Sequence, residues 1–317
     1  MSAPDTAVTQ ELFKIAYDNG VFNAVPQFAQ IQKNVKFNNA KKTGSAYNFA
    51  TMVRNPQGHT WTGGADLGTV VTLNGAVNGQ TKQGTVTACE YVLREQIAYG
   101  LISGTATQSG GFEPAADLLV SAVVNSASWA LELTLMHGGG SIGAIDTNTP
   151  GAGTTSVLLL TEASWAPGNF SAFEGGYFDL YDSTLTTKQN TDGPILIQAV
   201  NIDAISLTVE FASAGDRTAA SAGDLLVPTG AFGNWQYGIM PAITRAAAGS
   251  SLYGITTSSY GLMRSGTYDN GAGPLTFAAL ADAAVTSVAK GGMGDLVALV
   301  SPWAWTCLLY TSDAADE

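Results

Sequence analysis

The clearest hydrophobic pattern in the chain lies in residues 114–136, where apolar side chains recur at the helical period. Leu119, Val123 and Ala127 fall on one stripe, Pro114 suits a first helical turn, and the glycines at 138–140 suit a helix end. At ~1.5 Å per residue, such a helix would reach roughly 35 Å. Its uncharged part, residues 118–131, is too short and too polar for a typical membrane span. The pattern therefore predicts one long, weakly amphipathic helix outside any membrane.

The pattern before this helix has a period of two. Apolar residues alternate at 35–37 and 47–53, and six glycines interrupt residues 55–83, so we expect a long projecting β-hairpin there. Residues 86–100 return to an apolar pattern that fits a strand or a helix, and residues 103–111 indicate a flexible link. Near the N-terminus, residues 10–17 predict a short helix and residues 25–31 a further helical turn.

The region after the long helix is predicted to be rich in β-structure. A glycine-rich excursion at 141–155 precedes a short strand at 157–160 and one helical turn at 161–165 that stops at Pro167. An all-β insertion of ~60 residues then begins at residue 176, near the lower size limit of an independent domain. Its expected strands are 177–181, 195–200, 205–211 and 224–227. A helix at 274–290 and a strand at 296–300 follow, and no repeat of fixed period is present.

The composition describes a folded chain. Of the 317 residues, 45% are hydrophobic, 37 are Gly and only 12% are charged, which fits either an obligate assembly or a large β-rich core. The first twenty residues lack a charged-then-apolar leader pattern, so we expect the chain not to be secreted.

The last eleven residues, CLLYTSDAADE at 307–317, resemble the in-frame translation of a transposase sequencing adapter. We expect them to be a scar, with the natural protein continuing beyond Thr306. Only Cys89 then remains, and a single Cys supports neither an internal disulfide nor a CxxC metal motif.

Charge is unevenly distributed along the chain, whose formal net charge is −12. Residues 33–94 hold seven basic and two acidic residues, whereas residues 95–306 hold five basic and seventeen acidic ones. The basic residues are not interleaved with aromatic ones, so docking between copies of the chain is a better interpretation than nucleic-acid binding. A merely solvated hairpin stays open as the plainer alternative.

Motifs with catalytic patterns occur, but their contexts argue against them. Gly139, Ser141 and Gly143 fit GxSxG, yet both histidines precede the serine, opposite to the order expected of a nucleophile elbow. Gly138, Gly140 and Gly143 fit GxGxxG but follow a helix, which indicates a helix cap and not a pyrophosphate site. Residues 146–151 depart from a calcium loop at Pro150.

The remaining titratable residues do not form a site in the sequence. His59 and His137 with one cysteine are too few for zinc, and His137 at a helix end is expected to be a capping donor. Asp179 and Asp182 could act as an acid and base pair, but we expect them to be edge or solvent residues. The sequence thus predicts no catalytic residue, no metal site and no cofactor, and we expect that the protein is not an enzyme.

The order of elements, from basic glycine-rich hairpin through long helix to β-rich body, resembles the major capsid protein of tailed phages, the Hong Kong ninety-seven type fold. Three short stretches add to the likeness: Leu252-Tyr253-Gly254-Ile255, then Ser258-Ser259-Tyr260, and the Ala-Gly-Asp element at 222–224. The resemblance covers nearly all of residues 10–306. It implies an α+β capsid fold, C-terminally truncated. The implied parts are an N-terminal arm (1–41), an extended loop (42–87), a peripheral domain with its spine helix (88–175), an inserted β domain (176–240) and an incomplete axial/peripheral domain (241–306).

The resemblance implies a structural role in the icosahedral head of a double-stranded DNA phage. Partners would be further copies of the chain in hexamers and pentamers, with scaffold, protease and portal proteins, and packaged DNA held without sequence-specific contact. The protein would assemble in the host bacterial cytoplasm, reside in the virion and contact no membrane. Some relatives cross-link a loop Lys to a distant Asn, but no motif assigns Lys82 to that role. Expected assembly contacts are Lys41, Lys42, Arg54, Trp61 and Lys82. An encapsulin-like shell subunit and a β-rich bacterial surface or adhesion protein remain alternatives.

Overall fold

The structure is a computed structural model that describes residues 30–34, 46–61, 72–87, 89–96, 98, 115–170, 173–247, 250–271, 273, 275–289 and 296–313. The chain divides into two compact units. Unit 1 comprises Met1–Ala40 and Ala88–Pro241, and unit 2 comprises Lys41–Thr87 and Ala242–Glu317. The backbone therefore passes from one unit to the other three times.

The long helix of unit 1 is α4, Ala115–His137, which confirms the prediction to within one residue at each end. Gly139 follows it at φ +74°, a left-handed conformation that suits glycine and ends the helix. The C-terminal half of α4 packs on the core of unit 1 through Leu133 and Trp129, while Val120 and Val124 near its start are exposed. Among the described residues, Leu119–His137 is the one stretch long and apolar enough to cross a membrane, and little of it is buried, unlike a typical core helix. The expectation that this helix lies outside any membrane stays a prediction.

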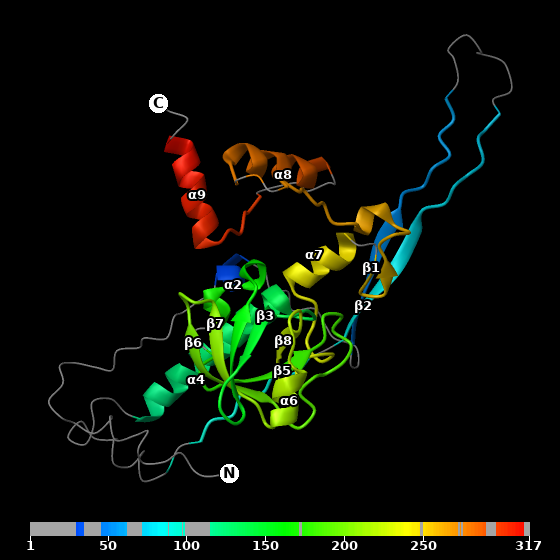
Figure 1. Cartoon of the computed structure of the whole chain (residues 1–317). Helices are drawn as coiled ribbons and strands as arrows, with labels where there is room; N and C mark the ends of the chain where they lie inside the picture. Colours follow the sequence, from blue (N-terminus) through cyan, green and yellow to red (C-terminus); the bar gives the residue numbers. More distant parts are fainter. Residues whose placement is uncertain are drawn as a thin grey trace. The chain divides into compact units, whose positions relative to one another are not determined.

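A closed six-stranded antiparallel barrel forms the body of unit 1, with strand order β3-β4-β7-β6-β5-β8 (Figure 1). The short helices of this unit are α2 (Gln30–Asn34), η3 (Glu162–Ser164), α5 (Pro167–Phe170) and α6 (Ala214–Ala219). The strands are β3 (Gly143–Pro150), β4 (Thr155–Leu160), β5 (Tyr177–Tyr181), β6 (Ile195–Asn201), β7 (Ser206–Glu210) and β8 (Leu225–Pro228).

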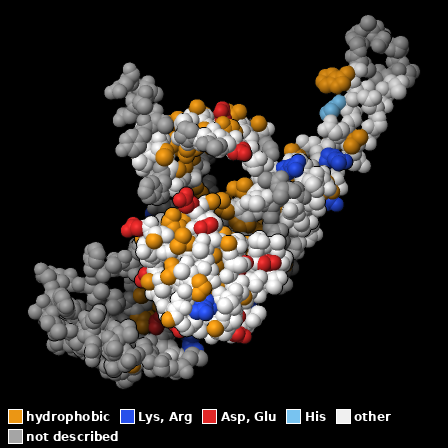
Figure 2. Space-filling model, viewed as in Figure 1, with side chains coloured by type: hydrophobic (Ala, Val, Ile, Leu, Met, Phe, Trp, Pro, Cys, Tyr) orange, Lys and Arg blue, Asp and Glu red, His pale blue; other side chains and the backbone are white. Residues whose placement is uncertain are grey.

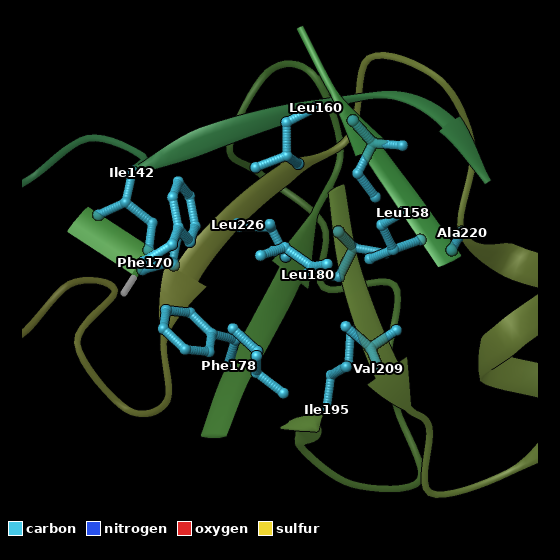
Figure 3. Packing of buried hydrophobic residues seen from close by; sticks show 14 of the residues in the cluster. Ile142, Leu158, Leu160, Phe170, Phe178, Leu180, Ile195, Val209, Ala220 and Leu226 are labelled. Carbon is cyan, nitrogen blue, oxygen red and sulfur yellow. The ribbon is translucent and has the colours of Figure 1, made fainter. Parts of the chain in front are cut away.

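Alternate side chains of a barrel strand point inward and help to fill the barrel. In β4, Ser156, Leu158 and Leu160 are buried, while Val157 and Leu159 between them are exposed, as expected when one face of a sheet meets the core. Leu158 of β4 and Leu180 of β5, from opposite sides of the ring of strands, point into the same apolar interior (Figure 3). The four strands predicted at 177–181, 195–200, 205–211 and 224–227 are confirmed as β5 to β8. In the sequence they stand out as short runs separated by turn signals.

The start of the β-structure is where the sequence-based interpretation was wrong. The glycine-rich excursion expected at 141–155 is mostly strand β3, which pairs with β4 and β8. The ring of Phe170 occupies the space beside Gly143 where a side chain would begin, since an added Cβ would lie 2.9 Å from Phe170 Cζ. Glycine therefore fits within the sheet at this position. The barrel therefore begins at Gly143, so it extends outside the predicted insertion at 176–240.

Two other expectations in unit 1 differ from the structure. Residues 89–96 form neither strand nor helix, although an apolar strand or helix was predicted over 86–100. Tyr91 and Val92 are exposed there, since no described strand pairs with them. The helical turn expected at 161–165 is confirmed as η3, but Pro167 begins the short helix α5 instead of stopping one, because proline suits a first helical position.

The described part of unit 2 contains the predicted hairpin, a second short hairpin and several helices. The hairpin strands are β1 (Ala46–Arg54) and β2 (Gln80–Thr87), and a second, short hairpin joins β9 (Ser251–Leu252) to β10 (Ile255–Thr256). The helix expected at 274–290 is confirmed as α8 (Phe277–Ala289). The strand expected at 296–300 is wrong, because these residues have no regular structure. The remaining elements are α7 (Ile239–Ala247), which carries the chain from unit 1 into unit 2, η4 (Gly261–Met263) and α9 (Pro302–Asp313).

Several predictions lie outside the described residues. They include the helix at 10–17, the link at 103–111, and the assembly residues Lys41 and Lys42.

Candidate assembly surface

The base of the β1-β2 hairpin is organised around a glycine paired with an aromatic ring. Phe49 and Gly84 are directly opposite in the antiparallel register, and Gly84 is buried. A Cβ at Gly84 would overlap the Phe49 ring, lying 2.8 Å from its Cε1 and Cε2. The glycine therefore lets the ring lie across the strand, which pins the pairing register.

The β9-β10 turn docks against this base. The backbone N–H of Thr85 donates to the carbonyl of Tyr253 at 3.0 Å, and the Tyr253 ring meets the edge of Phe49 with centroids 6.1 Å apart. Tyr253 and Gly254 have φ values of +52° and +86°, as a tight two-residue hairpin turn with the favoured twist requires. Sequence reasoning noticed the Leu-Tyr-Gly-Ile stretch but could not predict this contact.

Lys82 lies on the same face of the hairpin as Gly84, two residues before it in β2. It pairs in register with Thr51, and its Nζ lies 5.8 Å from the centroid of the Tyr260 ring. An ammonium over an aromatic face at this distance is attracted by the ring, by ~0.5–1 kcal/mol when exposed. The predicted assembly residue Lys82 is thus exposed but already engaged within its own unit.

The outer hairpin has almost no cover from the described part of its own unit. The N–H and C=O groups of Gln57 and Val77 exchange hydrogen bonds of 2.8 and 3.0 Å, and the Asn74 side chain donates to the carbonyl of His59 at 2.8 Å. All described residues in 55–61 and 72–79 are exposed except Thr60. Trp61, one of the predicted contacts, is 91% exposed. A two-stranded ribbon exposed on both faces is only marginally stable alone, so a partner surface would stabilise it.

The hairpin carries basic and no acidic side chains among its described residues, 46–61 and 72–87. Arg54 at the end of β1 and Lys82 in β2 are both exposed. In Figure 2 the hairpin shows blue and orange side chains, whereas red acidic side chains are spread over the barrel. Exposed barrel carboxylates include Asp146, Glu162, Glu174, Asp192 and Asp203. The two surfaces therefore have complementary charge.

One of the paired aspartates is not at the surface, contrary to the prediction. Asp179 is only 4% exposed, and its Oδ1 lies 2.7 Å from Lys188 Nζ. Its Oδ2 accepts from the N–H of Gly230, and its Oδ1 accepts from the Asn190 side chain. Every bond holds one barrel segment to another, so Asp179 is a structural carboxylate.

Asp182 closes the turn after β5. Its Oδ1 accepts from the backbone N–H groups of Thr186 at 2.7 Å and Thr187 at 3.1 Å, and its Oδ2 accepts from the hydroxyls of Thr184 and Thr186. These bonds favour the ionised carboxylate, so the pKa of Asp182 lies well below its ordinary value of 3.8. Such a group is saturated with donors, which argues against a role as a general acid or base.

Glu132 on α4 was missed by sequence reasoning. Its carboxylate accepts from the backbone N–H of Ile31 and, at 3.0 Å, from that of Gln32, at the start of α2. The Gln32 side chain donates to the carbonyl of Ser128. A carboxylate at a helix N-terminus satisfies otherwise orphaned N–H groups and suits the helix dipole. The long helix thus holds part of the predicted N-terminal arm.

The rejected motifs occupy structural positions. Gly138 and Gly140 follow α4, which agrees with a helix end, and residues 146–150 of the supposed calcium loop are part of strand β3. The amide of Asn169 and His137 Nε2 lie 2.9 Å apart, and burial lowers the pKa of His137. Within the part of the chain that the structure describes, no three His, Cys, Asp or Glu side chains gather as a metal would require.

Comparison of the chain with protein-family models, curated proteins and solved structures found no match.

Proposed function

We propose that this chain is the major capsid subunit of a tailed double-stranded DNA phage, and that copies of it assemble into the icosahedral head. The observation that carries the proposal is the hairpin: exposed on both faces in its outer part, basic, without acidic residues among those described, and with Trp61 almost fully exposed. A ribbon of this kind requires a second surface. Another copy supplies one, because the barrel is rich in exposed carboxylates.

The other features of the chain support the same role. Exposed large apolar side chains occur on α4, α8 and the barrel, and they would add apolar area to contacts between copies. Contacts between different patches of identical copies are heterologous, and such contacts generate rings and curved lattices. Hexamers and pentamers would follow from such contacts, with scaffold, protease and portal proteins as further partners. The packaged DNA would meet an acidic subunit that makes no sequence-specific contact with it, and the protein would reside in the virion.

The proposal is tested by assembly of the purified protein in solution. We expect particles in negative-stain electron microscopy and by light scattering. Trp61→Ala should slow assembly or shift it to higher protein concentration by about tenfold or more, as for an anchor residue worth at least ~1.4 kcal/mol. Leu262→Ala, at a side chain that is 67% exposed and outside the hairpin, is the matched control.

The proposal is wrong if the protein stays monomeric at all concentrations, or if Trp61→Ala and Leu262→Ala assemble alike. Shells that carry a bacterial enzyme as cargo, from a locus without phage packaging genes, would instead indicate an encapsulin-like container.

A further inference from the structure

Neighbouring strands of the barrel present an outer surface without a basic residue. Strands β3, β4, β7 and β6 are paired in that order (Figure 1), and their sequences contain no Lys or Arg. The register places two rows of uncharged side chains across the first three strands. We call them the barrel outer face; the rows are Thr149, Val157 and Thr208, and Thr147, Leu159 and Ser206.

The centre of the barrel outer face is apolar and exposed. The two rows point away from the core, because Leu158 and Leu207 between them are fully buried in it. Val157 is 37% exposed and Leu159 is 38% exposed, and Ile202, in the turn between β6 and β7, is 52% exposed. Outward positions of a solvated antiparallel sheet are usually polar. Adjacent apolar residues at such positions therefore favour a contact surface.

Carboxylates lie around the barrel outer face. Asp146 in β3 and Asp203 in the turn between β6 and β7 are exposed, and Glu210 at the end of β7 accepts a hydrogen bond from the Gln198 side chain at 2.8 Å. Arg217 reaches the turn between β3 and β4, but its guanidinium donates to the carbonyls of Gly151 and Gly153 at 2.9 and 2.6 Å. An apolar centre with an acidic rim selects a partner that is both apolar and basic.

The β1-β2 hairpin has the complementary surface. Its described residues include Arg54 and Lys82 and no acidic residue, and its exposed apolar side chains include Met52, Trp61, Leu73 and Val77. Paired strands lie ~4.8 Å apart, so a two-stranded ribbon is narrower than three or four barrel strands and fits flat on them. Its apolar side chains would cover Val157 and Leu159, and its basic ones would meet the acidic rim.

We propose that the barrel outer face is the docking site for the β1-β2 hairpin of a second copy of the chain. This inference rests on the proposed function, and it names the surface that the hairpin contacts during assembly. A second barrel is a poorer occupant, because it would bring two acidic rims together. A nucleic acid is also a poorer one, because its phosphates carry the same charge as the rim.

Photo-crosslinking in assembled particles locates the docking site. The crosslinking residue p-benzoylphenylalanine replaces Leu73, which is 76% exposed on the hairpin, and these copies are assembled with isotope-labelled copies that lack it. We expect cross-links to labelled peptides that contain residues 147–159 or 202–208. The same crosslinker in place of Leu262, an exposed residue of unit 2 outside the hairpin, should not link to these peptides.

A charge placed on the barrel outer face tests the contact energetically. Val157→Lys puts a cation where a basic hairpin docks, so assembly followed by light scattering should slow by about tenfold or more. Val120→Lys makes the same change at an exposed valine of helix α4 and should leave the rate unchanged. Thermal unfolding checks that both variants fold, and the cross-link locates the site even if Val157→Lys is less stable.

Two results would overturn this inference and leave the capsid proposal standing. One is particles whose cross-links fall on another surface or within a single copy, and the other is equal assembly rates for folded Val157→Lys and Val120→Lys. A protein that stays monomeric at all concentrations would instead refute the capsid proposal, and this inference with it.

Discussion

Gly84 shows how a single residue sets the conformation of the hairpin base. The adjacent strand places Phe49 directly across from it, and the ring occupies the space of the missing side chain. Because the ring also meets Tyr253, one glycine connects the hairpin to the β9-β10 turn. The packing at this point has no room for an added methyl group.

Gly84→Ala should therefore destabilise the hairpin base by about 1–3 kcal/mol, the usual cost of overpacking. Native-state hydrogen exchange of residues 46–54 and 80–87 measures the effect. Gly75→Ala is the matched control, since a Cβ at Gly75 meets no atom within 4 Å. Equal exchange in the two variants would show that Phe49 does not lie across Gly84.

Asp182 provides a prediction about pH. Its pKa is lowered in the folded state, chiefly by the N–H groups of Thr186 and Thr187, so its contribution to stability is present above the ordinary pKa of 3.8 and is lost as pH falls through the folded value. Carboxyl NMR titration should therefore find Asp182 still ionised at pH 3. Thr184→Ala removes one hydroxyl donor and should raise the pKa only partly, because the backbone donors remain. A midpoint near 3.8 in the parent protein would refute the turn geometry.

Residues in the barrel show why local sequence reasoning reaches a limit. Asp179 was expected at the surface because turns flank its strand, but its burial depends on Lys188, Asn190 and Gly230, which the fold brings to it. A buried carboxylate of this kind is recognised only when its partners are known. The same holds for Lys82, which the sequence marks as basic but cannot place over Tyr260.

At the scale of elements, helix α4 has two different halves. Its C-terminal half packs on the barrel and holds α2 through Glu132, while its first turns expose valines. The described part of the arm, the five-residue helix α2, is held by the Glu132 carboxylate, by hydrogen bonds between Gln32 and Ser128, and by burial of Ile31. So short a helix has little stability of its own, and its order comes from these contacts.

Glu132→Ala should release α2, because two backbone N–H groups lose their acceptor, at a cost of about 0.5–2 kcal/mol as for other helix caps. Faster hydrogen exchange of residues 30–34 is the expected readout. Glu132→Gln keeps an acceptor without the charge, so its exchange rate should lie between those of the parent protein and Glu132→Ala. Ser126→Ala, at an exposed position on the same helix, is the control. If α2 exchanges equally in the alanine variants, another contact holds the arm.

Elements with a strong local period were predictable, and those that depend on pairing were not. Helix α4 and strands β5 to β8 follow from apolar spacing within the segment itself. Strand β3 was missed since the glycines at 143, 151 and 153 suggest a loop, and only its pairing with β4 and β8 makes it a strand. The converse holds for residues 296–300, which have strand composition but no described partner. Of the candidate surface, the sequence predicted the exposed Arg54 and Trp61 and missed the contacts of Tyr253 and Glu132.

At the scale of the whole chain, the proposed capsid role would use charge and apolar surface together in contacts between copies. The chain has 25 acidic and 13 basic residues, and the acidic excess lies outside the hairpin. Attraction between a basic and an acidic patch steers the association of two copies and fixes their register more than it adds binding affinity. The apolar positions would then supply most of the binding energy.

Assembly of the protein should therefore slow as salt is raised, because the Debye length falls from ≈ 10 Å at 0.1 M to ≈ 3 Å at 1 M, so salt screens the attraction. Arg54→Glu reverses a hairpin charge and should slow assembly about tenfold or more at low salt, with the difference shrinking at high salt. Arg264→Glu makes the same charge change at an exposed residue of unit 2 outside the hairpin, so it should have little effect. Light-scattering kinetics measured between about 0.05 and 1 M salt distinguish the outcomes. Equal slowing by both variants would mean that net charge, and not the hairpin, controls assembly. Assembly rates that do not change with salt would contradict the docking of a basic hairpin on an acidic barrel.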